Sequence, residues 1–183
     1  MSHVVQSLRT PHPDPWVSRF AALVYAGGRV LDVACGNGRH TRLFLESGHP
    51  VTAIDRSTAA MEGLKRHKDL ELIEANIEAG PWPLAGRSFD AIVVVNYLHR
   101  PLLPVLNESL SPGGVLIYRT FGAGNAKYGK PSNPDFLLRP NELLDSFAGL
   151  EVVAFESGDT GTAVVQRICA VKRAAEEPLP LPV

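Results

Sequence analysis

Two glycines separated by a single residue follow a short apolar segment near the start of the chain. The segment Arg29 to Ala34 is apolar enough to form a buried strand, and Gly36-Asn37-Gly38 comes directly after Cys35. Glycines at such a turn let the backbone approach a ligand closely and present N–H groups at the start of the next helix. Dinucleotide binding is disfavoured, because the G-x-G-x-x-G pattern requires a third glycine where the chain has Thr41.

Two aspartates, Asp32 and Asp55, extend this pattern and favour a nucleoside that carries a cationic amine. Asp32 lies just before the glycines, where a carboxylate repels a pyrophosphate but attracts an amine. Asp55 ends a second apolar segment, 19 positions after Gly36, from where a carboxylate can bind ribose hydroxyls. The alternative for Asp55 is a helix N-cap or a surface turn.

Polar side chains also follow the third and fourth apolar segments. Asn76 and Glu78 come after the third, and the amide of Asn76 can either bind an adenine edge or close an Asx turn. The fourth segment, Phe89 to Val95, is the most apolar in the chain and lacks polar alternation, which is typical of a strand buried on both faces. It is followed by Asn96, Tyr97, Leu98, His99 and Arg100.

Each side chain of interest after the fourth segment has two interpretations. His99 is either a general base, since an imidazole exchanges protons near neutral pH, or a helix-start residue bonded to backbone. Tyr97 either shapes a reaction channel or packs in the core. Arg100 either anchors a substrate or is solvated.

The order of apolar segments predicts an α/β protein. Strands alternate with helices five times before an antiparallel hairpin around Ser157 to Gly161, so we expect a single-domain, Rossmann-like, doubly wound seven-stranded sheet that is mostly parallel. Ligands of such sheets bind at the carboxyl ends of the strands. The expected strands are residues 29–34, 51–54, 70–75, 89–95, 115–120, 151–156 and 162–172, and the expected helices are 16–25, 39–47, 57–68, 102–110 and one opened by Pro140.

Composition sets the remaining limits. With 183 residues we expect one domain over 16–172, a flexible segment over 1–15 and a disordered tail over 173–183. A net charge of -1 argues against a stable nucleic-acid partner. Cys35, Cys169 and the histidines lack metal-ligand spacing, so no metal site is expected. No secretory or membrane-spanning segment is recognised, so we expect a cytoplasmic protein, monomeric or weakly dimeric.

These segments together resemble the class I S-adenosylmethionine-dependent methyltransferases. The resemblance covers residues 16–172 and rests on RVLDVACGNGRHTRLFLESG, TAID, IEANIE, FDAIVVVNYLH and LSPGGVLIYRTF. Within that family, CGNGR and FLLRPNELLDSF resemble the small TehB-type, tellurite-resistance methyltransferases. The chain departs from the family at Ala34, usually glycine, and from the TehB type at residues 156–160, ESGDT, where a His-Arg pair is the rule.

The resemblance implies S-adenosyl-L-methionine as cofactor. It places Asp32 and the glycine loop at the methionine end, Asp55 at the ribose, Asn76 with Ile77 at the adenine, and the segment after Val95 at the sulfonium. The cofactor-binding residues so implied are Asp32, Ala34, Cys35, Gly36, Gly38, Asp55, Arg56, Asn76, Ile77 and Asn96, and the candidate catalytic residues are His99 and Tyr97.

Methyl transfer is an in-line displacement that needs alignment more than side-chain chemistry. The acceptor is expected to be a small molecule, with a thiol, amine or oxyanion as nucleophile. The long segment 121–138 is expected to be a substrate lid that orders on binding, and Arg100, Tyr128 and Arg139 are the candidate substrate contacts. The alternatives are methylation of RNA or protein, a non-catalytic regulatory subunit that binds the cofactor, and an NAD-binding oxidoreductase.

Overall fold

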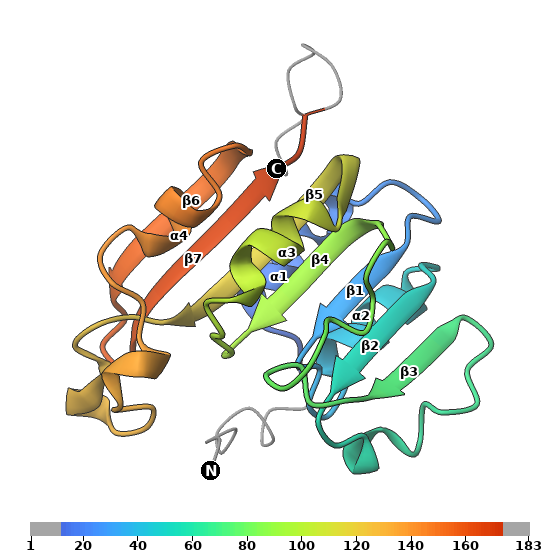
Figure 1. Ribbon diagram of the computed structural model, residues 1–183, viewed down its shortest axis with the longest axis horizontal. Helices are drawn as coiled ribbons and strands as arrows, with labels where there is room; N and C mark the ends of the chain where they lie inside the picture. The colour runs from blue at the N-terminus through green and yellow to red at the C-terminus, as the bar shows by residue number, and fades with distance from the viewer. Residues whose placement is uncertain (1–11, 174–183) are drawn as a thin grey trace.

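Seven strands form one sheet in the order β3-β2-β1-β4-β5-β7-β6 in the computed structural model, which describes residues 12–173 (Figure 1). Neighbouring strands from β3 to β5 are parallel, whereas β7 is antiparallel to both β5 and β6. The expected fold class is therefore confirmed. The strands are β1 (Val30–Val33), β2 (Val51–Asp55), β3 (Leu70–Glu74), β4 (Phe89–Val95), β5 (Leu110–Phe121), β6 (Glu151–Asp159) and β7 (Val164–Val171).

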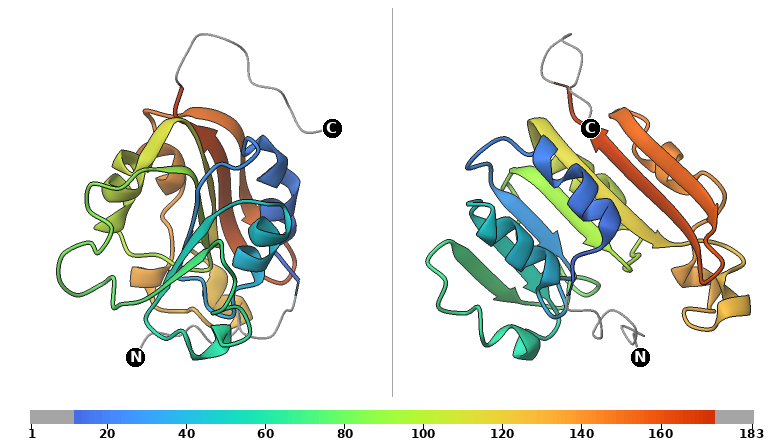
Figure 2. Two further views of the ribbon diagram at one scale, coloured as in Figure 1. Left: turned by 90° about the vertical axis from the view of Figure 1, so that its right-hand side faces the viewer. Right: turned by 180° about the vertical axis from the view of Figure 1, so that it is seen from behind.

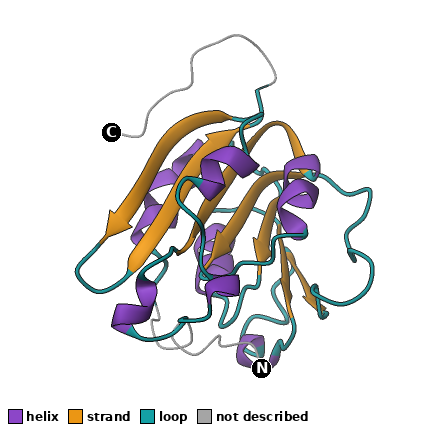
Figure 3. Cartoon of the chain, turned by 60° about the vertical axis from the view of Figure 1, so that its left-hand side comes forward, coloured by secondary structure: helices purple, strands orange, loops and turns teal. Residues whose placement is uncertain are grey.

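Helices cover both faces of the sheet (Figures 2 and 3). The helices α1 (Pro15–Phe20) and α2 (Arg39–Glu46) lie behind the sheet as drawn in Figure 1, and α3 (Leu102–Glu108) and α4 (Glu142–Ser146) lie in front. Short 3₁₀ helices complete the fold: η2 (Ala21–Leu23), η3 (Ala59–Met61), η4 (Asn125–Tyr128) and η5 (Pro134–Phe136).

The central strand β4 separates two apolar clusters. All seven of its residues are buried, including Asp90, as its lack of polar alternation predicts. Ile92 and Val94 pack with Leu106 of α3 and with Phe147, which directly follows α4, on one face. Ala91, Val93 and Val95 pack with residues of α1 and α2 on the other. Because parallel strands run the same way, their carboxyl ends gather at one edge, the arrowhead edge in Figure 1.

The chain becomes helical earlier than the expected flexible segment 1–15 allows. Asp14 caps α1, accepting a hydrogen bond from the Trp16 backbone N–H at 2.9 Å, and Pro15 occupies the first turn. An aspartate N-cap followed by proline favours a helix start, so α1 begins at Pro15, one residue before the expected domain boundary at residue 16. The rest of that segment up to residue 11, and the expected tail from residue 174, lie outside the described residues.

The prediction of a helix over residues 57–68 is wrong, because only the short 3₁₀ helix η3 forms there. Met61 is buried, but Gly63 interrupts the segment and the following residues are mostly exposed and charged. The backbone N–H and hydroxyl of Thr58 both donate to Glu74, at 2.9 and 2.8 Å. These bonds hold the segment as a turn against the end of β3.

Substitution of Gly38 can test how closely the loop after β1 packs against Met61 of this turn. A Cβ atom at Gly38 would collide with the Met61 Sδ, and its φ of +72° also disfavours a side chain. Gly48 has a similar φ of +83° with nothing within 4 Å. We expect Gly48→Ala to lower the free energy of unfolding by about 1 kcal/mol, and Gly38→Ala by about 2–4 kcal/mol. Urea titration of both variants measures the difference, and equal losses would contradict the packing.

Candidate functional site

A cavity of about 300 Å³ opens at the carboxyl edge of the strands. Its size is at the lower end of the range for small-molecule pockets. Residues that follow four neighbouring strands line it, which is where a ligand of a doubly wound sheet is expected. The lining residues are Ala34 and Gly36 after β1; Asp55, Arg56, Ser57, Ala59 and Ala60 at and after β2; Asn76, Ile77 and Glu78 after β3; and Tyr97 after β4.

Asp55 fixes the loops that follow β1 and β2. Its Oδ2 accepts from the Gly36 backbone N–H at 2.9 Å, and its Oδ1 accepts from the Ser57 backbone N–H at 3.0 Å. Each carboxylate oxygen can accept a second hydrogen bond. The half-buried carboxylate of Asp55 is therefore rigid and retains acceptor capacity toward the cavity that it lines.

The loop after β1 is wound unusually tightly. Ala34, Gly36 and Gly38 have φ values of +53°, +55° and +72°, and the Gly38 N–H donates to the Cys35 carbonyl at 2.9 Å. Left-handed geometry costs a residue with a Cβ roughly 1–2 kcal/mol, so Ala34 is strained where a glycine would not be. Such strain is found mostly at binding and catalytic sites.

Asp32 lies fully buried below this loop and does not line the cavity. The Thr41 hydroxyl donates to its Oδ2 at 2.6 Å. Burial raises the pKa of Asp32 to about 6, although the hydrogen bonds from Thr41 act in the opposite direction. Thr41, which replaces the third glycine of the dinucleotide pattern, thus supports the buried carboxyl group.

Asn76 and Tyr97 form the walls at the β3 and β4 ends. Asn76 Oδ1 accepts from the Glu78 backbone N–H at 3.1 Å, so the side chain closes an Asx turn while the residue lines the cavity. The Tyr97 hydroxyl is buried and has no hydrogen-bond partner among residues 12–173. Burial and, next, the negative charge of Glu78 raise the pKa of Tyr97, so its hydroxyl stays protonated and can donate.

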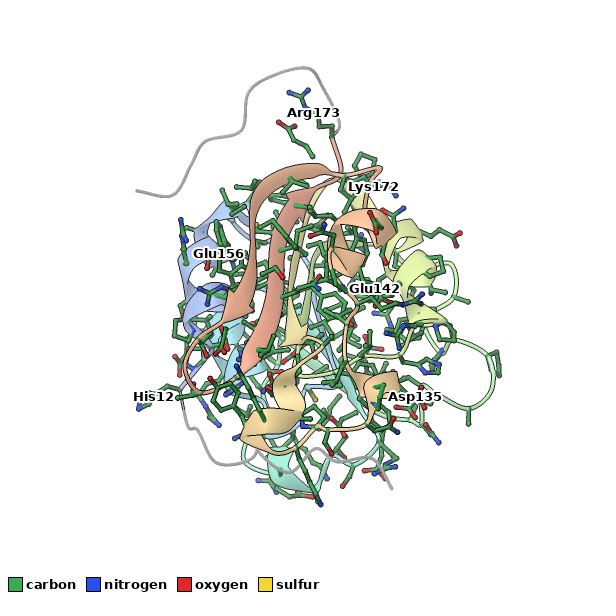
Figure 4. All side chains as sticks on the ribbon, turned by 90° about the vertical axis from the view of Figure 1, so that its left-hand side faces the viewer. His12, Asp135, Glu142, Glu156, Lys172 and Arg173 are labelled. Atoms are coloured by element: carbon green, nitrogen blue, oxygen red, sulfur yellow. The ribbon has the colours of Figure 1, made fainter. Side chains whose placement is uncertain are left out.

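The candidate substrate residues mostly hold the 121–138 segment. Arg100 donates to Glu142 Oε1 at 2.6 Å and to the carbonyls of Asp135 and Leu137 at 2.7 and 2.9 Å. Figure 4 shows Asp135 and Glu142 on the same side of the sheet. Arg100 therefore joins the start of α3 to this segment and to α4.

Tyr128 and Arg139 are also occupied by contacts within the protein. The Tyr128 hydroxyl donates to Asp159 Oδ1 at 2.7 Å, at the tip of the β6–β7 hairpin. Arg139 lies 3.7 Å from Glu142 with an exposed side chain. None of the three candidate substrate residues lines the cavity.

The structure brings together seven of the residues expected from the sequence: Ala34, Gly36, Asp55, Arg56, Asn76, Ile77 and Tyr97. Five others lie outside the lining, namely Asp32, Cys35, Gly38, Asn96 and His99. Burial raises the pKa of the Cys35 thiol, which argues against a nucleophilic thiolate. The sequence did not predict Ser57, Ala59 and Ala60 as site residues, because a helix was expected there. Glu78 was expected after the third strand but was given no role in the site.

Two further findings concern metals and membranes. No group of three or more His, Cys, Asp or Glu side chains within residues 12–173 could hold a metal ion. Among those same residues, no helix has the length and apolar character needed to cross a bilayer.

Comparison with known proteins finds similarity to methyltransferases. Residues 30–114 match a family model described as a methyltransferase domain. A malonyl-[acyl-carrier protein] O-methyltransferase of Enterobacter lignolyticus (strain SCF1) is 33% identical over 116 residues, which make up 60% of this chain and 45% of that protein. The chain thus spans less than half the length of this curated relative.

Solved structures share the fold at low sequence identity. TehB from Haemophilus influenzae superposes with a TM-score of 0.68 at 19% identity, covering 84% of this chain and 60% of that one. A second structure is the Burkholderia thailandensis 1,6-didemethyltoxoflavin-N1-methyltransferase with bound 1,6-didemethyltoxoflavin and S-adenosylhomocysteine. It superposes with a TM-score of 0.66 at 19% identity, covering 92% of this chain and 79% of that one. The matched domain, this relative and this sheet support a class I S-adenosylmethionine-dependent methyltransferase that resembles TehB in fold.

Proposed function

We propose that this protein transfers a methyl group from S-adenosylmethionine to a small molecule. The observation that carries the proposal is the position of Asp55, which lines the cavity with free acceptor capacity and binds the Gly36 N–H of the loop after β1. A carboxylate at the end of β2 beside a glycine loop is suited to ribose hydroxyls.

The other lining residues fit the remaining parts of the cofactor. Ile77, Ala59 and Ala60 offer apolar contacts for the faces of an adenine ring. The Tyr97 hydroxyl, buried without a partner, can donate to a nucleoside heteroatom. Asp32 lies below the loop after β1, where the resemblance places the methionine end with its ammonium group. The donors and acceptors present therefore suit an adenosine linked to an amino acid.

Bound S-adenosylmethionine would supply an electrophilic methyl group on a sulfonium. The chain's own residues then have to hold the cofactor, exclude water and align the acceptor with the methyl–sulfur bond. Alignment alone can contribute on the order of 7–11 kcal/mol to the lowering of a barrier. His99 and Tyr97 remain candidates for contacts with the reacting groups.

A small acceptor and a lid complete the proposal. The 1,6-didemethyltoxoflavin-N1-methyltransferase with the same fold was solved with bound 1,6-didemethyltoxoflavin and S-adenosylhomocysteine. In this chain, residues 121–138 continue directly from β5, at the same edge as the cavity, and we propose that they cover the acceptor. Asn125 anchors the segment by donating to the Pro131 carbonyl and accepting from the Val164 N–H, both at 3.0 Å.

Calorimetric titration tests cofactor binding. We expect S-adenosylmethionine and S-adenosylhomocysteine to bind, and Asp55→Asn to weaken both by about 10–100-fold, because one charge-assisted hydrogen bond is worth about 1.5–3 kcal/mol. Asp69→Asn is the matched control, since the exposed Asp69 precedes β3 at the opposite edge of the sheet. Binding of NAD alone would support an oxidoreductase and contradict the proposal.

We expect the ionised form of the buried Asp32 to destabilise the fold, so that the free energy of unfolding depends on pH. Its pKa of about 6 lies above the usual 3.8, so the folded protein holds this proton more tightly than the unfolded chain. Stability contributed by the neutral form is therefore lost as pH rises from about 4 to about 6. We expect Asp32→Asn to raise the free energy of unfolding by up to about 3 kcal/mol near pH 7.5 and little near pH 4.

Urea titrations of the parent and Asp32→Asn at both pH values measure this effect. If the carboxylate serves the methionine ammonium group, the stabilised variant should also bind S-adenosylmethionine more weakly. A variant less stable than the parent near pH 7.5 would show that the ionised carboxylate supports the fold instead.

Hydrogen exchange tests the lid. The Ala123 N–H donates to the Leu138 carbonyl at 2.8 Å, and the Leu138 N–H donates to the Phe121 carbonyl at 2.9 Å. These two amides should therefore exchange slowly under all conditions. We expect the amides of residues 126–136 to exchange faster, and to slow when S-adenosylhomocysteine and an acceptor bind. Equal protection with and without the ligands would contradict a lid that orders on binding.

A further inference from the structure

We propose that the methyl acceptor reacts through an anionic oxygen, which the side-chain amide NH₂ of Asn96 binds and which Arg119 serves by positioning that amide. This inference rests on the proposed methyl transfer and narrows its substrate class. It follows from the hydrogen bonds that the side chain of Asn96 makes within the protein.

Arg119 determines the orientation of the Asn96 amide. Arg119 Nη1 donates to Asn96 Oδ1. A guanidinium carries only donors, so the amide atom that faces it must be the oxygen, and Nδ2 lies on the opposite side of the amide. The backbone is fixed too, because Asn96 has a φ of +58° and its N–H donates to the Arg119 carbonyl at 2.9 Å.

Arg119 is itself held in place. Its side chain is only 16% exposed, its Nε lies 3.7 Å from Asp14 Oδ2, and its guanidinium lies 5.2 Å from the centre of the Phe121 ring. Asp14 is in turn fixed as the cap of α1. The Asn96 amide is therefore oriented by a network that extends to the start of α1, rather than by solvent.

Strand order places Asn96 at the reacting end. Residues after β3, β2 and β1 line the cavity, and Tyr97, the residue next to Asn96, lines its β4 end. Strand β4 pairs with β1, with Val94 opposite Val33. Asn96 therefore follows β4 beside the loop Ala34 to Gly36. An elongated cofactor that starts over β3 and passes this loop ends near Asn96. Among residues 12–173, the structure gives Asn96 Nδ2 no hydrogen-bond partner.

The network around the Asn96 amide contains two guanidinium groups, those of Arg119 and Arg39. Arg119 faces the carboxylate of Asp14, Arg39 faces those of Asp14 and Asp32, and both arginines are largely buried. His40 is not an available base, because its Nε2 accepts from the Asp14 N–H at 3.1 Å and burial lowers its pKa to about 3. An amine that accepts the methyl group needs a base or a hydrogen-bond acceptor beside it. An oxyanion that accepts the methyl group needs a hydrogen-bond donor instead.

The reaction balances without a general base. A lone pair of the oxyanion forms the new O–C bond, and the methyl–sulfur pair passes to sulfur, which becomes a neutral thioether. The negative charge of the oxygen and the positive charge of the sulfonium disappear together, and no proton is released. Carboxylates, enolates and phenolates satisfy this requirement.

The test uses methyl-tritiated S-adenosylmethionine and a panel of carboxylic acids, phenols, thiols and amines of matched size. We expect transfer to oxygen acids, and a loss of about 100-fold in Asn96→Asp, which replaces the donor with a carboxylate but still accepts from Arg119. Affinity for S-adenosylhomocysteine should change little. Transfer to amines or thiols instead, an unchanged rate in Asn96→Asp, or no transfer to any oxygen acid would overturn the inference.

The positioning role of Arg119 needs its own variants. Arg119→Lys keeps a donor for Asn96 Oδ1 and should retain most activity, whereas Arg119→Met should lower kcat more than it raises KM. Arg167→Met is the control, because Arg167 pairs with Arg119 across β5 and β7 but contacts Glu156 and the Trp16 ring instead of Asn96. In the parent, kcat/KM should rise with pH around the acceptor's own pKa. Failure of S-adenosylhomocysteine to bind at all would reject the proposed function instead.

Discussion

The site depends on one carboxylate that joins two loops. Asp55 accepts the Gly36 N–H with one oxygen and the Ser57 N–H with the other, so the loop after β1 and the turn after β2 cannot move independently. The same two backbone N–H groups stabilise the negative charge of the half-buried Asp55 carboxylate. The same carboxylate retains acceptor sites that face the cavity, and these give the nucleoside interpretation its physical basis.

Around this carboxylate, the protein tolerates features that do not favour folding. Ala34 adopts a left-handed conformation, Asp32 is a carboxyl group buried under the loop, and the Tyr97 hydroxyl is buried without a partner. Each of these raises the free energy of the fold, and all three lie after or within strands whose carboxyl ends form the cavity edge. Their concentration at one edge is the expected pattern for a binding site, because strain and unpaired polar groups are retained where a ligand can use them.

The sheet could be predicted from the sequence because its strands are unambiguous. The apolar run Phe89–Val95 can only be a buried strand in this context, and its neighbours follow the same rule. The segment 57–68 could not be predicted in the same way. Ala60, Met61 and Leu64 have helical spacing, but Gly63 and the hydrogen bonds from Thr58 to Glu74, a contact distant in sequence, favour a turn. The cavity residues missed at 57–60 follow from that single error.

The candidate site was predictable where it depends on strand ends, and unpredictable where it depends on long-range partners. Asp55, Asn76 and Ile77 line the cavity as expected because strand topology alone places them. The roles of Arg100 and Asn96 depend on Glu142 and Arg119, whose proximity no local pattern reveals. Arg100 therefore bridges α3 and α4 instead of lining the cavity, and Asn96 acquires a fixed orientation that its sequence neighbours do not suggest.

The most direct measurement is a crystal structure of the protein with S-adenosylhomocysteine. The account predicts that the ribose hydroxyls lie within hydrogen-bond distance of the Asp55 carboxylate, that the adenine contacts Ile77, and that the sulfur lies toward Asn96. An adenosine bound elsewhere, or one that leaves Asp55 bonded only to Gly36 and Ser57, would contradict the account.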